Sequence, residues 1–321
     1  MQAETGCEKG GNAKKSLVDQ LKHIQQEPLS RNALISKDSC AVSTGDCPQC
    51  RGEGIVQGRR GIYASAELCV CVQNCRLCLG KNMDVSGGVA RACKSPSPLK
   101  RSNLYNRACI PARYTGARLE KFSNNSGNCM EIARNVTAWV DKLTRSTDLH
   151  RQKGFILSGP VGCGKTWLLA AVAKRLASHG ISIRFVDFFQ LISEIKSALM
   201  TREAITSDFL RVFLEVDVLA IDELGKGRRT DFEQTVLDQL VMGRYNQEKI
   251  IIASTNCRIG RLYRKDADYF GEAPRSEGAR FDVTDVPLFQ AVGERIYSRL
   301  EETTEFLAMK GSDMRSDGRS S

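Results

Sequence analysis

Short apolar runs alternate with longer amphipathic stretches over the C-terminal two thirds of the chain. The apolar runs are too short for helices and show no polar alternation, which is typical of strands that are buried on both faces. Strands that alternate with helices indicate a parallel sheet flanked by helices. The pattern therefore predicts an α/β fold over residues 110–315. The predicted strands are 153–158, 181–186, 217–223, 249–256 and 305–310.

The predicted helices follow from apolar residues at helical spacing. The clearest stretch, 167–176, contains no helix breaker, and the spacing of Ile132, Val136 and Trp139 predicts another helix over 128–142. Two helical stretches run from the second strand to about Leu214, and residues 288–307 contain a further helix. Residues 257–287, which are charged and interspersed with glycine and proline, are predicted to form a long loop.

The N-terminal third has a different composition. Residues 1–39 are polar, and we expect them to be disordered apart from a short amphipathic helix carrying Leu17 and Leu21. Residues 40–93 are rich in cysteine, residues 94–109 have the proline and basic residues of a linker, and residues 316–321 are expected to form a flexible tail.

A phosphate-binding pattern, GxxxxGK[ST], joins the first predicted strand to the helix that follows. Glycines allow backbone N–H groups to turn toward a phosphate, and the helix N-terminus adds partial positive charge. Lys165 would reach the β- and γ-phosphates of ATP, and the Thr166 hydroxyl would hold Mg²⁺. The pattern occupies Gly159, Pro160, Val161, Gly162, Cys163, Gly164, Lys165 and Thr166.

Two carboxylates end the third predicted strand, as in a Walker B motif. Asp222 would bind Mg²⁺ through water, and Glu223 would orient and activate the water that attacks ATP. The next strand ends at Asn256, whose amide would position the same water if the two strands are neighbours.

The cysteine-rich segment has the ligand spacing of zinc sites. Its CxxC, CxC and CxxC pairs are Cys47 and Cys50, Cys69 and Cys71, and Cys75 and Cys78. Such pairs predict tetrahedral zinc, and incidental or redox-active cysteines are the alternative. The pairing stays open. Either the first four cysteines form one site and Cys75 and Cys78 recruit Cys93 and Cys109, or the two CxxC pairs share one ion.

Charge and hydropathy narrow the choice of partners. Residues 1–113 contain 17 Lys and Arg against 9 Asp and Glu, which accounts for most of the net charge of +10. A basic region indicates contact with nucleic acid or an acidic partner, unless it is simply a solvated surface. No apolar run approaches the ~18 residues that span a bilayer, and the N-terminus is not a signal peptide. We therefore expect a cytoplasmic protein without a membrane partner, in which thirteen cysteines favour metal binding over disulfides.

These motifs together resemble the AAA+ ATPases of the DnaC/DnaI helicase-loader and IstB transposition-helper group. The resemblance covers residues 110–315, and the CPxCxGxG knuckle with its CxC pair resembles the zinc-bearing N-terminal domain of the DnaI-like branch. The extra knuckle at 75–80 departs from that pattern. The matching segments are 159–166, 221–225, 254–256, 293–300 and 311–315.

The resemblance implies roles for two arginines and for the first segment of the ATPase. Arg299 would act as an arginine finger toward a neighbouring subunit, and Arg315 would contact the γ-phosphate in its own subunit. Arginine suits both roles because it spreads charge over phosphoryl oxygens. The segment 110–114, leading to Leu119 and Phe122, would pack near the adenine.

The expected function is therefore a Mg²⁺-dependent ATPase that loads the replicative helicase on single-stranded DNA. It would assemble into an ATP-dependent oligomer, with Lys196, Arg202 and Arg211 as candidate phosphate contacts. One alternative is an IstB-type ATPase that delivers a transposase on duplex DNA. The other is a zinc-bearing adaptor that uses ATP as a switch.

Overall fold

The computed structural model describes parts of the cysteine-rich segment and most of the α/β domain, where residues 202–205 and 261–283 are the longest gaps. The predicted N-terminal helix, Cys75, Cys78, Cys93, Arg315 and the C-terminal tail lie outside the described residues. The described residues are 41–43, 47–74, 83–84, 91–92, 97–146, 148–149, 152–201, 206–260 and 284–314.

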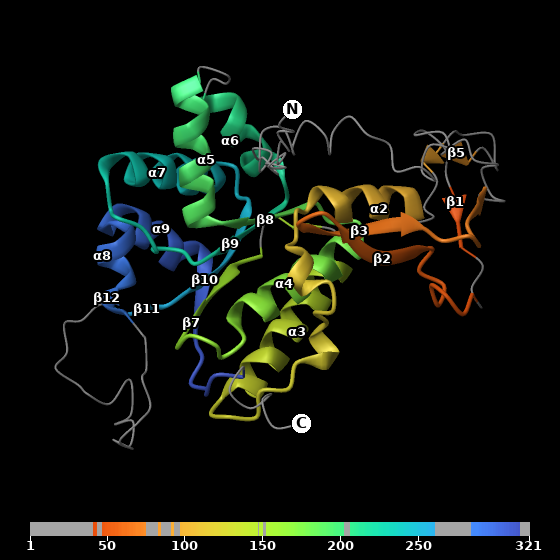
Figure 1. The fold of residues 1–321 in the computed structure, drawn as a ribbon, viewed down its shortest axis with the longest axis horizontal. Helices are drawn as coiled ribbons and strands as arrows, with labels where there is room; N and C mark the ends of the chain where they lie inside the picture. Colours follow the sequence, from red (N-terminus) through yellow and green to blue (C-terminus); the bar gives the residue numbers. More distant parts are fainter. Residues whose placement is uncertain are drawn as a thin grey trace, which may run out of the picture.

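A five-stranded parallel sheet forms the centre of the α/β domain (Figure 1). Its strand order is β13-β7-β10-β9-β8, and every neighbouring pair is parallel. The strand before the phosphate loop, β7, thus lies inside the sheet and is buried along its whole length. The predicted α/β fold is confirmed. The strands are β7 (Gly154–Ser158), β8 (Ile183–Asp187), β9 (Val218–Asp222), β10 (Ile250–Thr255) and β13 (Thr304–Ala308).

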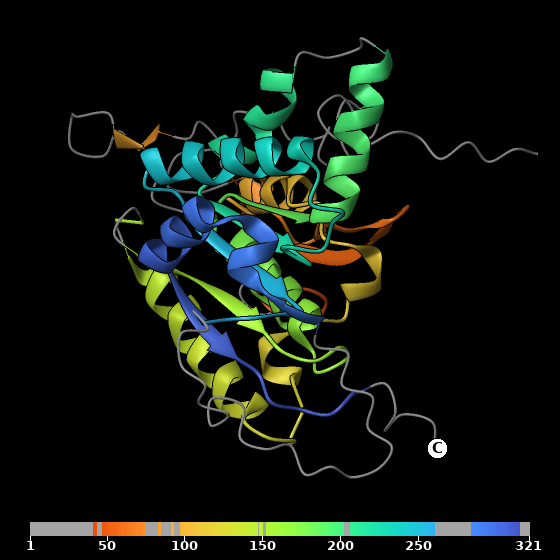
Figure 2. The same cartoon turned by 90° about the vertical axis from the view of Figure 1, so that its left-hand side faces the viewer.

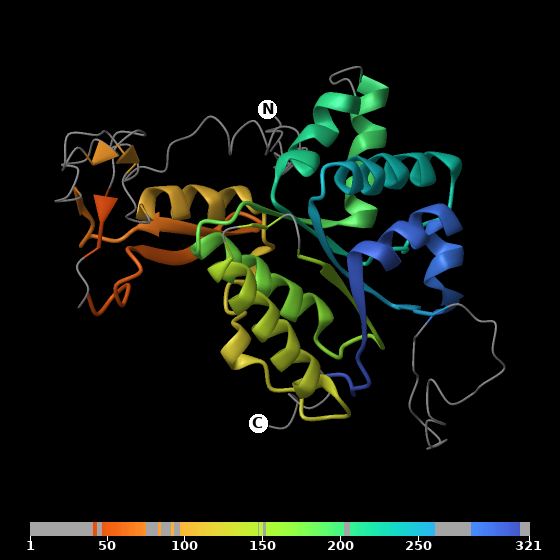
Figure 3. The same cartoon turned by 180° about the vertical axis from the view of Figure 1, so that it is seen from behind.

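Helices cover both faces of this sheet (Figures 2 and 3). Successive strand residues point to opposite faces, so Ile252 packs with α3 and α4, whereas Ile251 packs on the other face with α5, α6, α7 and α9. This alternation explains why the strands are apolar throughout. The helices are α3 (Cys129–Arg145), α4 (Lys165–Ser178), α5 (Phe188–Thr201), α6 (Thr206–Glu215), α7 (Asp231–Asn246), α8 (Leu288–Val292) and α9 (Glu294–Thr303).

An antiparallel hairpin of β2 (Ile55–Arg60) and β3 (Tyr63–Leu68) projects beside the sheet (Figure 1). Its apolar residues Ile55, Ala64 and Ala66 belong to the same buried cluster as α3 and α4. The backbone joins them too, since the Ala64 N–H donates to the Ile110 carbonyl at 2.7 Å. The hairpin is therefore packed against the ATPase domain as part of a continuous core.

Residues 98–107 form a helix, α2 (Pro98–Arg107), instead of the predicted basic linker. Pro98 stands in the first turn, where a proline costs no hydrogen bond. Tyr105 is fully buried, and the Ser102 hydroxyl donates to the Ala66 carbonyl of β3 at 2.7 Å. The linker prediction is wrong here because this helix fills the space between the hairpin and the ATPase.

The remaining elements are short. Part of the predicted loop 257–287 differs from expectation, because its two ends pair as parallel strands, β11 and β12. Gly293, at φ 87°, separates α8 from α9. The short strands are β1 (Ala41–Val42), β4 (Gln73–Asn74), β5 (Met83–Asp84), β6 (Arg91–Ala92), β11 (Cys257–Arg258) and β12 (Thr284–Pro287), and the 3₁₀ helices are η2 (Ala112–Tyr114) and η3 (Leu119–Lys121).

Candidate nucleotide and metal sites

The phosphate loop connects β7 to α4, as its sequence pattern predicts. Gly162 and Gly164 adopt φ of 83° and 102°, a left-handed region that side chains avoid. The buried Lys165 ammonium donates to the carbonyls of Gly159 at 2.8 Å and Pro160 at 2.6 Å. Burial lowers the pKa of this ammonium. A buried ammonium beside a glycine loop at a helix N-terminus is the arrangement that a phosphate group would complete.

Thr166 and Asp222 meet at the carboxyl edge of the sheet. The Thr166 hydroxyl donates to Asp222 Oδ1 at 2.9 Å, and the Ser254 hydroxyl donates to the same oxygen. Burial raises the pKa of Asp222 to about 6. A buried carboxylate next to a hydroxyl fits Mg²⁺, a hard cation that takes oxygen ligands and keeps several waters.

Glu223 lies one residue beyond β9, in the left-handed region at φ 56°. Its backbone N–H donates to Ser254 Oγ at 3.2 Å, and Lys226 Nζ donates to its carboxylate at 2.5 Å. Strand β10 lies next to β9, which meets the condition set for Asn256, and Asn256 follows β10 and is half-buried.

Ser254 is a site residue that the sequence analysis missed. Its hydroxyl contacts both Walker B residues, the carboxylate of Asp222 and the backbone N–H of Glu223. The available signal was its place two residues before Asn256, near the end of the strand that was considered as a neighbour of the Walker B strand.

Aromatic residues lie beside the phosphate loop. Phe122 is buried, packs against Gly164 and lies 5.7 Å from the Trp167 ring, measured between centroids. The segment 110–122 therefore reaches the loop, as the expected adenine-side packing requires.

Arg299 lies on α9. Its Nη1 donates to Tyr245 Oη and to Glu302 Oε2, both at 3.2 Å. The two described candidates for DNA contact are also paired with acidic residues of this chain. Lys196 lies 3.7 Å from Glu233, and Arg211 Nε donates to Glu215 at 2.5 Å.

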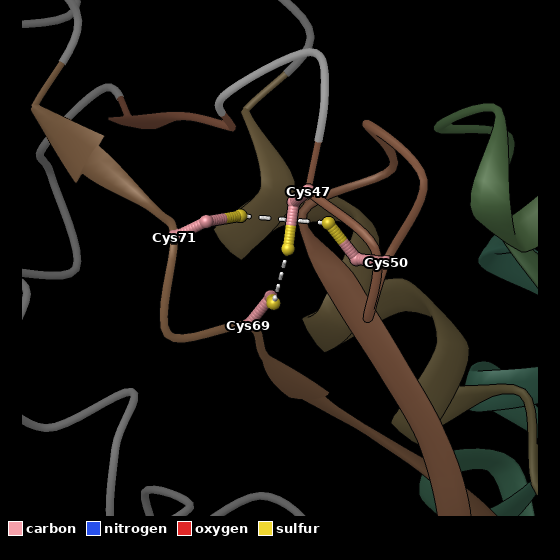
Figure 4. A group of neighbouring side chains, drawn as sticks. All are labelled: Cys47, Cys50, Cys69 and Cys71. Carbon is pink, nitrogen blue, oxygen red and sulfur yellow. Dashed lines mark hydrogen bonds between the residues drawn. The ribbon is translucent and has the colours of Figure 1, made fainter.

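Four cysteines converge at the base of the hairpin (Figure 4). Cys47 and Cys50 come from the turn before β2, and Cys69 and Cys71 follow β3. The Sγ atoms of Cys47 and Cys69 are 3.6 Å apart, those of Cys50 and Cys71 are 3.5 Å apart, and all four lie within 4.8 Å of one another. Cys109, which was considered for a second site, is buried elsewhere and is not in this group.

These distances match a tetrahedral Cys₄ zinc site, in which ~2.3 Å Zn–S bonds place the sulfurs about 3.8 Å apart. The backbone N–H of Cys50 lowers the pKa of Cys47 to about 7, which favours the thiolate, whereas burial raises the pKa of Cys69 to about 12. A bound cation would offset that burial. The structure therefore brings together the first four cysteines, as the first of the two pairings predicts, and Cys75 and Cys78 lie outside the described residues.

The strand order and the loop after β7 are those of the P-loop fold of the AAA+ type. Residues 133–261 match the family described as IstB-like ATP binding protein. This match agrees with the resemblance noted in the sequence over these residues.

Curated relatives agree with this assignment. The chain is 24% identical over 152 residues to the replicative helicase loader DnaC of Buchnera aphidicola subsp. Schizaphis graminum, covering 47% of this chain and 60% of that protein. It is 22% identical over 164 residues to DnaC of Escherichia coli K12, covering 51% and 65%. It is 37% identical over 87 residues to the uncharacterized protein YdaV of the same strain, covering 27% and 35%. The match thus spans less than two thirds of each relative.

Solved structures with similar chains include a DnaC helicase loader, with a TM-score of 0.48 and 24% identity over 62% of this chain and 99% of that one. The replication initiator DnaA bound to AMPPCP and single-stranded DNA gives a TM-score of 0.44 at 19% identity, covering 61% of this chain and 50% of that one. No helix in the described part of the chain is long and apolar enough to cross a membrane.

Proposed function

We propose that this protein is an ATP-hydrolysing helicase loader of DNA replication, acting with Mg²⁺. The observation that supports it most directly is the contact of Thr166 with Asp222 below the phosphate loop. It occurs in a domain that matches the IstB-like family over residues 133–261, and several curated relatives of the chain are replicative helicase loaders.

Each residue of the site has a chemical task in this proposal. The phosphate loop and Lys165 bind the phosphates, and Thr166 and Asp222 hold Mg²⁺, which neutralises charge on the phosphoryl oxygens. Glu223 accepts a proton from the attacking water, after leaving its ion pair with Lys226. Asn256 orients that water, and Arg299 and Arg315 supply the remaining positive charge.

The four-cysteine site would hold zinc and make the hairpin a rigid surface for the hexameric helicase. Its role is structural, because four thiolates leave no open position on a tetrahedral ion. The ATPase subunits would self-associate on single-stranded DNA, with Arg299 completing the site of a neighbour.

An IstB-type transposition helper is the second candidate, favoured by the description of the family that residues 133–261 match. The two functions differ in the DNA they require. Binding should be measured with a fluorescent oligo(dT) and with a duplex of equal length, each with ATPγS and Mg²⁺ at several salt concentrations. Preference for the single strand supports the loader, and preference for the duplex supports the transposition helper.

A measurement of ATP hydrolysis tests the third alternative, a zinc-bearing adaptor that binds ATP as a switch without hydrolysing it. Purified protein should release phosphate from ATP only with Mg²⁺ present. Binding of ATP without turnover, in the presence of either DNA, would instead favour the zinc-bearing adaptor.

A further inference from the structure

We infer that Asn124 is a positioning residue for ATP, whose side-chain amide fixes the phosphate loop in its binding shape and ties it to the segment after β13. This inference rests on the proposed binding of ATP. It concerns a residue outside the loop, from the segment between η3 and α3.

Asn124 is 4% exposed, and both ends of its amide are used. Its Nδ2 donates to the Cys163 carbonyl of the phosphate loop at 3.1 Å and to the Ser312 carbonyl at 3.3 Å. Its Oδ1 accepts from the Ser126 N–H at 3.0 Å and from the Ser126 hydroxyl at 2.5 Å. One side chain therefore bridges two segments that are 149 residues apart in sequence, from 163 to 312.

The contact to Cys163 has a geometric consequence for phosphate binding. A trans peptide is planar, so its C=O and N–H point in opposite directions. Asn124 holds the Cys163 carbonyl, so the Gly164 N–H of the same peptide points in the opposite direction, away from Asn124. The Met314 N–H does the same for the preceding peptide, because it donates to the Gly162 carbonyl at 3.1 Å. Two successive loop amides are thus oriented by donors from outside the loop.

The segment that supplies Met314 is itself held by neighbours of Asn124. Asn128 Nδ2 donates to the Ala308 carbonyl at 2.8 Å, and its Oδ1 accepts from the Lys310 N–H at 2.7 Å. The Ser312 N–H donates to Ser126 Oγ at 2.8 Å. Asn128 therefore anchors the segment without touching the phosphate loop, whereas Asn124 contacts both.

This difference provides matched variants. Asn124→Ala removes every side-chain contact, and Asn124→Asp keeps the acceptor toward Ser126 while losing both donated bonds. Asn128→Ala removes two bonds to the same segment and none to the loop. Asn125→Ala changes the adjacent exposed asparagine and serves as the control.

The first test measures the dissociation constant of Mg²⁺–ATPγS by calorimetry, with KM and kcat for ATP hydrolysis. We expect both Asn124 variants to bind about tenfold more weakly, because each lost hydrogen bond is worth a few-fold in affinity. KM should rise equally and kcat should change by less than about twofold, since the loop binds ground and transition states alike. Asn125→Ala should behave as the wild type, and Asn128→Ala should lower thermal stability with little change in affinity.

Wild-type affinity in both Asn124 variants would overturn the inference, as would an equal loss in Asn128→Ala. Failure of the wild type to bind ATPγS would instead overturn the proposed function. If the Asn124 variants do not fold, the inference is tested by amide hydrogen exchange of the wild-type protein with and without ATPγS. ATPγS should slow exchange at residues 162–164 and at 309–314 together, and protection of the loop alone would contradict the inference.

Discussion

The guanidinium of Arg299 lies over the ring of Tyr245, 4.5 Å from its centroid to the guanidinium carbon. The Tyr245 hydroxyl also donates to the carboxylate of Glu302 at 3.1 Å, and Glu302 accepts from Arg299 at 3.2 Å. The three side chains thus hold one another across α7 and α9. Because the Arg299 side chain is 39% exposed, a neighbouring subunit could be reached from this position.

We predict that Arg299→Ala lowers ATP turnover by roughly 10³–10⁵ while changing ATP affinity little, as expected for an arginine that acts on the transition state of a neighbour. Steady-state hydrolysis and ATPγS binding measure the two effects. Arg295→Ala, at a 72% exposed position on the same helix, is the control and should retain activity.

Mixing tests whether Arg299 acts across an interface. Arg299→Ala subunits keep an intact phosphate loop, and Lys165→Ala subunits keep an intact Arg299. Mixed assemblies should therefore regain part of the activity that each lacks alone. If activity is not recovered at any ratio although crosslinking verifies mixed assembly, Arg299 does not act across an interface. Its role would then be the structural one of its contacts with Tyr245 and Glu302.

Lys165→Ala and Glu223→Gln should separate binding from hydrolysis. Lys165→Ala should abolish ATP binding, because the loop loses its only ammonium toward the phosphates. Glu223→Gln should bind ATP and fail to cleave it, since an amide cannot accept the proton of the attacking water. Equilibrium binding and single-turnover hydrolysis distinguish the two, and wild-type cleavage by Glu223→Gln would contradict the assigned role.

Freshly purified, reduced protein should contain at least one zinc per chain. Chelation should lower the thermal midpoint of the ATPase as well as unfold the hairpin, because Ile55 and Ala66 belong to the core that covers the sheet. Cys71→Ser should reduce the metal content, measured by plasma mass spectrometry, whereas Val70→Ala, 63% exposed between two ligands, should retain it. Less than one zinc per wild-type chain would count against the site.

Arg244→Met should lower the free energy of unfolding by about 3 kcal/mol. The Arg244 side chain is fully buried and donates to the carbonyls of Phe213 and Ile250 at 2.7 and 2.6 Å, among others, and burial lowers its pKa. Methionine fills the volume and leaves those carbonyls unpaired. Urea unfolding measures the change, and Arg295→Met should cost less than about 0.5 kcal/mol.

The motifs with fixed local spacing could be predicted from the sequence. The phosphate loop, the carboxylates of Asp222 and Glu223 and the first four cysteines are defined by residues close in the chain, so their patterns carry the geometry. The five strands were recognisable because both faces of the sheet are buried. The roles assigned to Glu223, Asn256, Arg299 and Arg315 stay predictions.

Features that depend on distant contacts were not predicted. Helix α2 was not recognised because of Pro98 and its basic residues, and its buried face includes Ser102, whose partner Ala66 lies in β3 of the hairpin. Arg244 would be taken for a surface residue from its type, but its guanidinium bonds to carbonyls of α6, of β10 and of the residues just before β9. The sequence near Asn124 did not reveal its role, because its partners Cys163 and Ser312 are distant in the chain.

The position of β7 in the sheet also has a consequence for the newly made chain. Both of its neighbours, β10 and β13, are synthesised after it, and β13 pairs with it through Thr304 opposite Gly154. An incomplete chain on the ribosome therefore exposes an unpaired apolar strand, a hazard for aggregation. Since the Met314 N–H also donates to the Gly162 carbonyl, termination between Glu223 and Met314 would yield a chain that has both Walker B carboxylates and an incompletely held phosphate loop.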